Sequence, residues 1–495
     1  MLLSSSIRLA RNRQLANEKI VSTQGKIKSL NTELHGLYEL LNESSLVSLI
    51  PLEILVEIFL FATESEFAEG PTSKLPIPII IGRVCRGWRK AAWGAPPIWK
   101  NLRVNLRPSL RWVIGFQAAI VKEWVQRSGN QPLNLVLYHH VPAQSREEVS
   151  ALGIFQPLLD VSHRWRRFQI GGWGPGFYEL QAKLQETQHH FTLLTEIAMF
   201  ADEPKVLQKY GWNFSSAPRL VDVSIYEPLR PVDCQLAWNE VVSFIGIVNL
   251  EASLFVLKEA RETLESCSLD LATRSWLGPS TGAIGGVNCL PNLETLSIEL
   301  QLEADSDTWD DRWVDLAPFF QQLEAPALTS LHLTLNGADF GRLLPSFKDL
   351  AYRSKFFLYD LNLAFPDIPE EDLVELLATL PTLTHFTLGS HRDQRLFSDR
   401  TILMLDPTSG RPIMECLPNL IRLEFTGSIS FSPETLITML QNRQTFAGVD
   451  YIDNIDIKYY NKNWAQEDPN AMREFYRQLD AKEGFLTDVD IVWTK

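Results

Sequence analysis

The side chains best suited to chemistry are few and scattered in this sequence. Its five cysteines stand at positions 85, 234, 267, 289 and 416, and no two of them form a Cys-x-x-Cys pair. The histidine pairs His139-His140 and His189-His190 lack a third ligand at metal spacing. We therefore expect reduced core thiols, with neither a zinc site nor a disulfide framework.

Catalytic motifs are also missing from the sequence. It holds no Gly-x-Ser-x-Gly elbow, no His-Glu-x-x-His and no phosphate-binding loop. The glycine stretch GGWGPGF at 171–177 fails the dinucleotide-binding spacing and is typical of a turn-rich loop. The acidic run at 303–311 lacks calcium-loop spacing, which leaves a solvated loop or a contact for a basic partner. We predict no catalytic residue, no metal and no cofactor, and hence a protein that is not an enzyme.

Length and composition narrow the class of protein. A chain of 495 residues with 45% hydrophobic and 21% charged residues is typical of a globular protein with several domains or a repeat array. The formal charge of -14 argues against a surface that binds nucleic acid. No apolar run approaches the roughly 20 residues that a membrane helix needs. We expect a cytoplasmic and/or nuclear protein with no nucleic-acid or membrane partner.

The stretch SLIPLEILVEIFLFA at 48–62 is densely apolar. Pro51 suits the first position of a helix, where its missing N–H costs nothing. Beyond it, only Glu53 and Glu57 are polar over ten residues. The apolar residues form two stripes, one of Leu52, Leu55, Val56 and Phe59 and the other of Ile54, Ile58 and Phe61. A helix that is apolar on two faces needs two partners.

A second helical segment follows a linker. The linker at 63–78 is rich in proline, glycine and acidic residues. In IIIGRVCRGWRKAAW at 79–93, Val84 and Trp88 share one helix face and the basic residues take the other. Two prolines in APPIW at 95–99 end this helix. We expect the Trp88 helix to cover one of the two apolar stripes.

Five sequence elements follow one another between residues 49 and 99. They are Ile50-Pro51-Leu52-Glu53-Ile54-Leu55, Ile58-Phe59, Val84-Cys85-Arg86-Gly87-Trp88-Arg89, Ala91-Ala92 and Ile98-Trp99. In this order they resemble an F-box, a helical module that binds a Skp-type adaptor of cullin-RING ubiquitin ligases. The linker is longer than is usual in the family, and Ile50 stands where Leu is commoner. The layout, with a heptad-like helix ahead of the box, is similar to F-box proteins of mushroom-forming fungi.

The resemblance implies a docking role for this segment. A Skp-type adaptor would bind it and, through the adaptor, a cullin. The residues implied to bind the adaptor are Ile50, Pro51, Leu52, Ile54, Leu55, Ile58, Phe59, Val84, Cys85, Trp88 and Trp99.

Residues 1–45 predict one helix with heptad spacing. Apolar residues recur at Ile20, Ile27, Leu30, Leu34, Leu37 and Leu41, as in the seam of a coiled coil. Gly25 and Gly36 weaken the pattern. Two interpretations stay open, a coiled coil with a partner helix or a lone amphipathic helix laid on the next domain.

Nine places beyond residue 130 fit a Leu-x-x-Leu-x-Leu spacing when other apolar residues are allowed. They begin at Trp165, Leu194, Leu220, Leu264, Leu293, Leu328, Leu358, Leu383 and Leu420. Several follow a proline by two residues, as in Leu-Pro-Asn-Leu at 290 and at 417, which fits a loop that turns into a strand. Helical patterns such as PEEDLVELLATL at 369–380 lie between them.

This pattern resembles a leucine-rich repeat array, in which each unit adds one strand to a parallel sheet and one helix or irregular arc to the outside. The Asn or Cys that usually stands eight residues after the first Leu occurs once, as Asn336. We therefore expect an irregular array without a continuous asparagine ladder, with atypical end units at 132–140 and 446–495. An ordinary α/β sheet domain remains the alternative.

The sequence as a whole predicts an α/β protein of four parts. They are an N-terminal heptad-like helix at 1–45, a three-helix F-box at 46–100, a helical linker at 101–130, and an irregular leucine-rich-repeat-like solenoid with parallel strands and outer helices at 131–495. The implied function is the substrate-recognition subunit of an SCF-type ubiquitin ligase, with an unknown protein substrate. Alternatives are a scaffolding protein that binds a Skp adaptor without cullin, or an enzyme whose site carries no recognisable motif.

Overall fold

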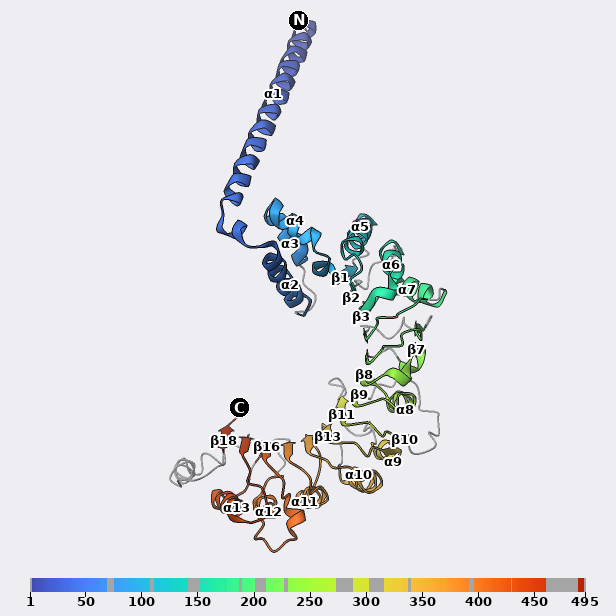
Figure 1. Cartoon of the computed structure of the whole chain (residues 1–495), viewed down its shortest axis with the longest axis vertical. Coiled ribbons are helices and arrows are strands. Elements are labelled where there is room, and N and C mark those ends of the chain that lie inside the picture. The colour runs from blue at the N-terminus through green and yellow to red at the C-terminus, as the bar shows by residue number, and fades with distance from the viewer. Residues whose placement is uncertain are drawn as a thin grey trace. The chain divides into compact units, whose positions relative to one another are not determined.

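The protein is a mixed α/β chain with a large parallel β-sheet (Figure 1), seen in a computed structural model. The structure describes residues 2–68, 75–106, 111–140, 152–173, 175–186, 189–200, 211–226, 230–272, 288–301, 316–336, 340–390, 396–428, 430–459 and 488–493. The chain divides into two compact units, one of Met1–Leu137 with Gly153–Arg164 and the other of Tyr138–Leu152 with Trp165–Lys495. Each unit is described by itself.

Helices make up the first part of unit 1. They are α1 (Leu2–Glu43), α2 (Leu52–Ala68), α3 (Ile77–Val84) and α4 (Arg86–Gly94). Pro51 stands immediately before α2, and α2 runs six residues into the segment for which we predict a linker. The helices α2, α3 and α4 all contact one another, and α2 also contacts the 3-10 turn Pro96–Trp99.

Strands and helices alternate in the rest of unit 1. They are β1 (Asn101–Leu106), α5 (Arg111–Arg127), β2 (Leu133–His140) and α6 (Leu152–Leu159). The segment 101–130 therefore opens with a strand, although its sequence predicts only a helical linker. Leu102, Val104 and Leu106 are buried at alternate positions of β1, which is the period of a strand. The run PLNLVLYHH, predicted as an end unit, forms β2.

Unit 2 is built on parallel strands that lie side by side in chain order. They are β3 (Trp165–Trp173), β4 (Glu196–Met199), β6 (Asp222–Ile225), β8 (Ser243–Val248), β9 (Ser266–Ala272), β11 (Thr295–Gln301), β13 (Ser330–Thr334), β14 (Asp360–Ala364), β15 (His385–Gly389), β16 (Arg422–Gly427), β17 (Asn454–Tyr459) and β18 (Asp488–Trp493). Two short parallel pairs accompany them, β5 (Trp212–Phe214) with β7 (Cys234–Leu236) and β10 (Asn288–Cys289) with β12 (Leu323–Glu324). The predicted parallel sheet is confirmed.

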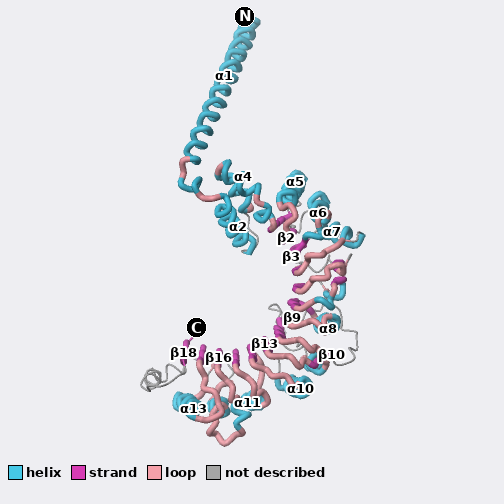
Figure 2. Tube along the Cα trace, in the orientation of Figure 1, coloured by secondary structure: helices cyan, strands magenta, loops and turns pink. Residues whose placement is uncertain are grey.

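Helices and loops connect the strands of unit 2. The helices are α7 (Pro175–Glu186), α8 (Leu250–Glu259), α9 (Ala317–Gln321), α10 (Phe340–Ser354), α11 (Glu370–Ala378), α12 (Asp399–Met404) and α13 (Pro433–Thr445). From β13 to β16, α10 to α13 lie on one side of the strands (Figure 1), and Figure 2 shows that loop makes up much of the connecting chain. The outward positions of these strands are mainly polar, as at Ser330, His332, Asp360 and Arg422.

The core of unit 2 follows the apolar spacing of the sequence. Each of the nine motifs forms a strand, and its second apolar position pairs in register with the next strand, as Leu296 does with Leu331 and Leu331 with Leu361. The first position of every motif is fully buried. Among the strands of the large sheet from β3 to β16, β8 is the one that no motif predicts. There Gly246 occupies a position that is apolar in its neighbours, and the ring of Phe244 fills the space, 2.8 Å from where a Cβ would stand.

Side-chain hydrogen bonds tie successive units together without a continuous asparagine ladder. Thr195, Thr329 and Thr384 each follow the first apolar position of a motif, and each donates its hydroxyl to the carbonyl of the corresponding residue one strand earlier, over 3.1, 3.2 and 2.9 Å. The tetrapeptides that introduce the strands form hydrogen-bonded turns, for example from Leu420 N–H to the carbonyl of Leu417 over 3.1 Å. Polar side chains thus fix the spacing of consecutive strands.

A buried arginine holds the loops near the end of the sheet. Arg443 of α13 is 1% exposed and donates from Nη1 to the carbonyls of Leu405 and Cys416, at 3.0 and 2.9 Å. Its Nη2 donates to the carbonyl of Leu417 at 2.9 Å, and its Nε to that of Asp450 at 3.1 Å. Burial lowers the pKa of Arg443 to about 10, so it still carries its charge at neutral pH.

The five thiols differ in their exposure. All five cysteines are free; Cys234, Cys267 and Cys416 are buried, Cys85 is half-buried and Cys289 is exposed, so not every thiol is in the core. Burial raises the pKa of the Cys267 thiol to about 12, which makes it unreactive.

The segment 446–495 ends in the two strands β17 and β18, and any helix between them lies outside the described residues. The acidic run at 303–311 also lies outside the described residues. In the described part of the chain, no helix has the length and apolarity needed to cross a membrane.

Candidate functional site

The outer stripe of α2 is an exposed apolar surface in unit 1. Its members Ile54, Ile58 and Phe61 are 53%, 50% and 75% exposed. The residues that flank the start of the helix are exposed too, with Leu49 at 75% and Leu52 at 57%. We call Ile54, Ile58 and Phe61 the α2 patch. Large apolar side chains exposed along one helix face in this way are typical of a site for a partner.

The opposite stripe of α2 is buried within unit 1 at Leu55 and Phe59, whereas Leu52 at its start is exposed and Val56 is half-buried. Leu55 and Phe59 are 8% and 2% exposed, and Thr63, one helical turn further on, is 4% exposed. The ring centroids of Phe59 and Trp88 lie 5.0 Å apart with their planes tilted by 58°. The Trp88 helix therefore covers one of the two stripes, as the sequence predicts, and leaves the other open.

The junction between α3 and α4 is fixed by local hydrogen bonds. Cys85 stands at the N-cap of α4, where its sulfur accepts a hydrogen bond from the backbone N–H of Trp88, with 3.4 Å between nitrogen and sulfur. Arg89 donates from Nε to the carbonyl of Gly82 over 2.6 Å. These contacts set the angle at which Trp88 meets α2. Cys85 thus has a capping role that its place in the predicted adaptor set did not reveal.

Trp99 lies in the interior of unit 1. It is 3% exposed, and its Nε1 donates to the carbonyl of Ala92 over 2.8 Å. Its ring meets that of Trp124 edge to face, with centroids 4.8 Å apart. Together with Leu55 and Phe59, Trp99 therefore supports the surface from beneath and does not line it in the unbound chain.

The remaining residues of the predicted adaptor set are at least partly accessible. Pro51 is exposed, Ile50 is half-buried, and Val84 at the end of α3 is 54% exposed. The predicted set omitted Leu49 and Phe61, which are among the most exposed apolar residues of the segment. The i, i+4, i+7 spacing of Ile54, Ile58 and Phe61 was the signal for Phe61.

The far end of α2 is anchored by basic residues. Lys100 Nζ lies 2.7 Å from Oε1 of Glu64. Arg103 of β1 donates from Nη2 to the carbonyl of Phe67 over 2.8 Å, and its guanidinium lies over the Phe67 ring at 5.6 Å. Because the far end and one face of α2 are held, the α2 patch is presented on a helix of fixed orientation.

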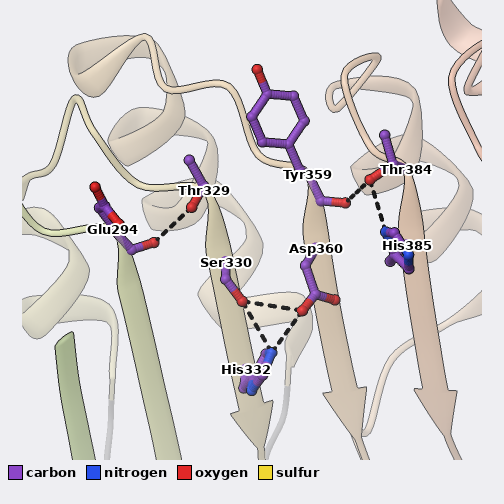
Figure 3. A network of polar contacts seen from close by, with 8 residues as sticks. All are labelled: Glu294, Thr329, Ser330, His332, Tyr359, Asp360, Thr384 and His385. Atoms are coloured by element: carbon purple, nitrogen blue, oxygen red, sulfur yellow. Dashed lines mark hydrogen bonds and ion pairs between the residues drawn. The ribbon is translucent and has the colours of Figure 1, made fainter. Parts of the chain in front are cut away.

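A second candidate lies on the polar face of the unit 2 strands. Ser330, His332 and Asp360 meet there on β13 and β14 (Figure 3). His332 Nε2 is 3.0 Å from Oδ2 of Asp360 and 3.1 Å from Ser330 Oγ, and the serine hydroxyl donates to the same Oδ2 over 3.1 Å. The hydrogen bond to Asp360 raises the pKa of His332, and the hydrogen bond from His332 lowers the pKa of Asp360.

This cluster has the residues of a hydrolytic triad but not its geometry. In a triad the serine and the carboxylate bind opposite nitrogens of the histidine ring, so that a proton moves from one side to the other. Here both bind Nε2, and the carboxylate accepts directly from the serine hydroxyl. His332 and Asp360 are also about 40% exposed (40% and 39%). The cluster is suited to recognition through hydrogen bonds and charge, and not to nucleophilic attack.

Nothing in the sequence motifs singled out this cluster. Its residues occupy the outward positions between the apolar positions of two consecutive motifs, which begin at Leu328 and Leu358. Their proximity depends on the pairing of Ser330 with Asp360 across the two strands. Within the described residues, no three His, Cys, Asp or Glu side chains are grouped so as to hold a metal ion. No protein-family model matches this chain, and no curated protein matches it in sequence.

Proposed function

We propose that this chain is the substrate-recognition subunit of an SCF-type cullin-RING ubiquitin ligase. In this proposal α2, α3 and α4 form an F-box that docks a Skp-type adaptor, and through it a cullin, while unit 2 binds the target protein. The chain itself carries out no chemistry. The exposed α2 patch carries the proposal, because it lies on the segment that resembles an F-box and its opposite face is occupied by Trp88.

The energetics of the α2 patch support adaptor docking. Burial of a large apolar side chain contributes roughly 1.5 to 3 kcal/mol. Ile54, Ile58 and Phe61 are each at least half exposed, so most of that free energy is still to be gained on binding. The helix is held at its far end and along its buried face, and it loses little conformational freedom when the partner arrives.

The arrangement of unit 2 supports a leucine-rich-repeat-like solenoid as the target-binding part. Its parallel strands follow chain order, its apolar motifs pair in register, and its threonines link one unit to the next. Tyr359, one residue before β14, is 47% exposed, and its ring points away from the Ser330–His332–Asp360 cluster (Figure 3). Exposed aromatic rings are enriched at protein-binding surfaces.

Affinity capture tests the proposal. The full chain is recovered from cells in which the proteasome is inhibited, and the associated proteins are identified. We expect a Skp-type adaptor and a cullin, together with ubiquitin-modified target. Capture that lacks any Skp-type adaptor would refute the docking assignment. Recovery of the adaptor without cullin, under conditions that preserve an intact ligase, would favour the scaffolding alternative.

A purified system tests the docking of adaptor and cullin apart from the binding of a target. The full chain is titrated with a recombinant Skp-type adaptor, and a cullin N-terminal domain is then added. The Ile58→Asp variant is compared with Phe116→Asp, which changes an exposed apolar residue of α5 in the same unit. Binding that is lost only in Ile58→Asp supports the α2 patch. Equal binding by both variants would contradict it.

A further inference from the structure

The N-terminal helix α1 presents an apolar seam that stays exposed in the described part of the chain. The seam consists of Ile20, Ile27, Leu30, Leu34, Leu37 and Leu41, which are 53%, 53%, 63%, 45%, 58% and 68% exposed. Of residues 11–42 only Glu39 is half-buried and the rest are exposed, and Glu39 pairs with Arg86 over 2.5 Å. Glu39 lies on the side of the helix opposite the seam, so the seam faces away from this contact.

The seam has the seven-residue spacing that two long helices need in order to wind around each other. Ile20, Ile27, Leu34 and Leu41 occupy the first core position of successive heptads, and Leu30 and Leu37 the second. Gly25 and Gly36 lie outside the seam, and a Cβ at either would meet no atom within 4 Å. The glycines therefore do not interrupt the packing surface.

The charges beside the seam point to a second copy of this chain as the partner. Lys26 and Glu33 occupy the same flanking position in consecutive heptads, one residue before Ile27 and Leu34. Neither has an oppositely charged residue three or four positions away on its own helix. In an antiparallel pair this flanking position meets its counterpart on the other helix, so Lys26 of each copy faces Glu33 of the other.

The same register fills the core. With Lys26 opposite Glu33, Ile27 faces Leu30 of the other copy and Ile20 faces Leu37. Leu34 then meets Thr23 and Leu41 meets Ala16, so no charge enters the seam. On the remaining flank Gln24 faces Asn31, two side chains that hydrogen-bond to each other. A parallel pair would instead place Lys26 beside Asn31 and Glu33 beside Tyr38, and would form neither ion pair.

We propose that α1 mediates an antiparallel homodimer of this chain, held by the apolar seam and by two reciprocal Lys26–Glu33 ion pairs. Such a dimer would carry two copies of unit 1 and two of unit 2. The proposal does not depend on what unit 1 or unit 2 binds.

Charge exchange in the full chain tests both the partner and the orientation. Analytical ultracentrifugation of the unchanged chain at micromolar concentration should give the mass of two copies. Lys26→Glu and Glu33→Lys each replace two attractions by two repulsions, and each should raise the dissociation constant about tenfold. The double variant Lys26→Glu/Glu33→Lys should restore it, which general misfolding would not. Lys28→Glu, on the outward side of the helix, is the matched control and should change nothing.

Disulfide trapping gives an independent readout of orientation. Chains with Ile27→Cys are mixed with chains with Leu30→Cys under mild oxidation, beside the unchanged chain with its own thiols. The antiparallel dimer should form the mixed disulfide, whereas a parallel dimer would join each variant to itself. A chain that stays monomeric at micromolar concentration, or a double variant that is not restored, overturns the proposal.

Discussion

The rings of Phe59 and Trp88 form the contact that joins α2 to α4, with their centroids 5.0 Å apart. Phe59 is 2% exposed, and Trp88 is half-buried. The pair therefore sits at the boundary between the core of unit 1 and its surface. Residues of α2 on the Trp88 side hold the helix in place. Residues on the outer side are exposed to a partner.

Loss of the Phe59 ring should destabilise the helical part of unit 1. Phe59→Ala removes a buried aromatic side chain, and we expect the free energy of unfolding to fall by about 3–5 kcal/mol. Denaturant unfolding followed by amide hydrogen exchange in α2 and α4 measures it. Trp88→Phe keeps an aromatic ring against Phe59 and should cost clearly less. A Phe59→Ala variant as stable as the original would show that the pair does not hold the helices.

Substitution of an exposed apolar residue of α2 should lower adaptor affinity and leave the stability of the chain nearly unchanged. Ile58 is 50% exposed, so Ile58→Asp should leave the free energy of unfolding within about 0.5 kcal/mol of the original value. Affinity for a Skp-type adaptor should fall about thirtyfold or more, which corresponds to about 2 kcal/mol. Calorimetric titration measures the affinity, with Phe116→Asp as the control. Undiminished affinity in Ile58→Asp would exclude the α2 patch as the docking surface.

Leu55 is one of the residues that hold α2 in place, although the resemblance to an F-box groups it with the adaptor contacts. Because Leu55 is 8% exposed, Leu55→Ala should lower stability by about 2–3 kcal/mol, and any loss of adaptor binding would follow from that. Ile54→Ala, one residue away and 53% exposed, should lower adaptor affinity without a comparable loss of stability. Parallel unfolding and binding measurements on the two variants would distinguish the roles. Similar stability in both would contradict the assignment.

The Ser330–His332–Asp360 cluster should make stability depend on pH. The pKa of His332 is raised by its hydrogen bond to Asp360, so its contribution is complete below the unfolded value near 6.5 and is lost as pH rises through the raised value. The pKa of Asp360 is lowered by the same bond, so its contribution is lost as pH falls through the lowered value. Solvent screening limits the effect to about 1 kcal/mol or less, because both side chains are about 40% exposed (40% and 39%).

His332→Gln should therefore destabilise unit 2 most between about pH 4 and 6.5, and least in alkaline solution. Chemical denaturation of both proteins across this range gives the difference. In an NMR titration, Asp360→Asn should shift the pKa of His332 downward. A pKa of His332 that is unchanged in Asp360→Asn would show that the two side chains do not interact in solution.

The sequence predicts the strands of unit 2 well because their positions are set by burial. A buried column of apolar residues repeats in every unit, and each of the nine motifs that show it forms a strand. The cluster on the strand face leaves no such trace. Ser330 and Asp360 are polar residues in separate motifs, and only the pairing of β13 with β14 brings them together. The sequence also did not show that Leu55 and Trp99 are buried, because an apolar motif does not indicate which of its residues face inward.

The loops near α13 depend on one buried side chain. Arg443→Met should lower the free energy of unfolding of unit 2 by about 3–5 kcal/mol, because it leaves the carbonyls of Leu405, Cys416 and Leu417 without their donor. Arg443→Lys should also destabilise, since an ammonium group cannot reach several carbonyls in the fixed directions of a guanidinium. Thermal unfolding measures both. Arg422→Met, an exposed position on the strand face, is the control, and an equal loss in that variant would contradict the assignment.

Strand β8, which no motif predicts, supplies a sharp test of how unit 2 packs. Gly246 breaks the apolar motif of β8, yet a Cβ there would lie 2.8 Å from both the Ile225 carbonyl oxygen and the Phe244 ring. Gly246→Ala should therefore destabilise unit 2 by about 1–3 kcal/mol, because the strand or the ring must move. At Gly389 in β15 the nearest atom to a Cβ is 3.6 Å away, so Gly389→Ala should be close to neutral. Denaturant unfolding compares the two. If they behave alike, Phe244 does not fill the place of the missing side chain, and the register of β8 against β6 is not the one described.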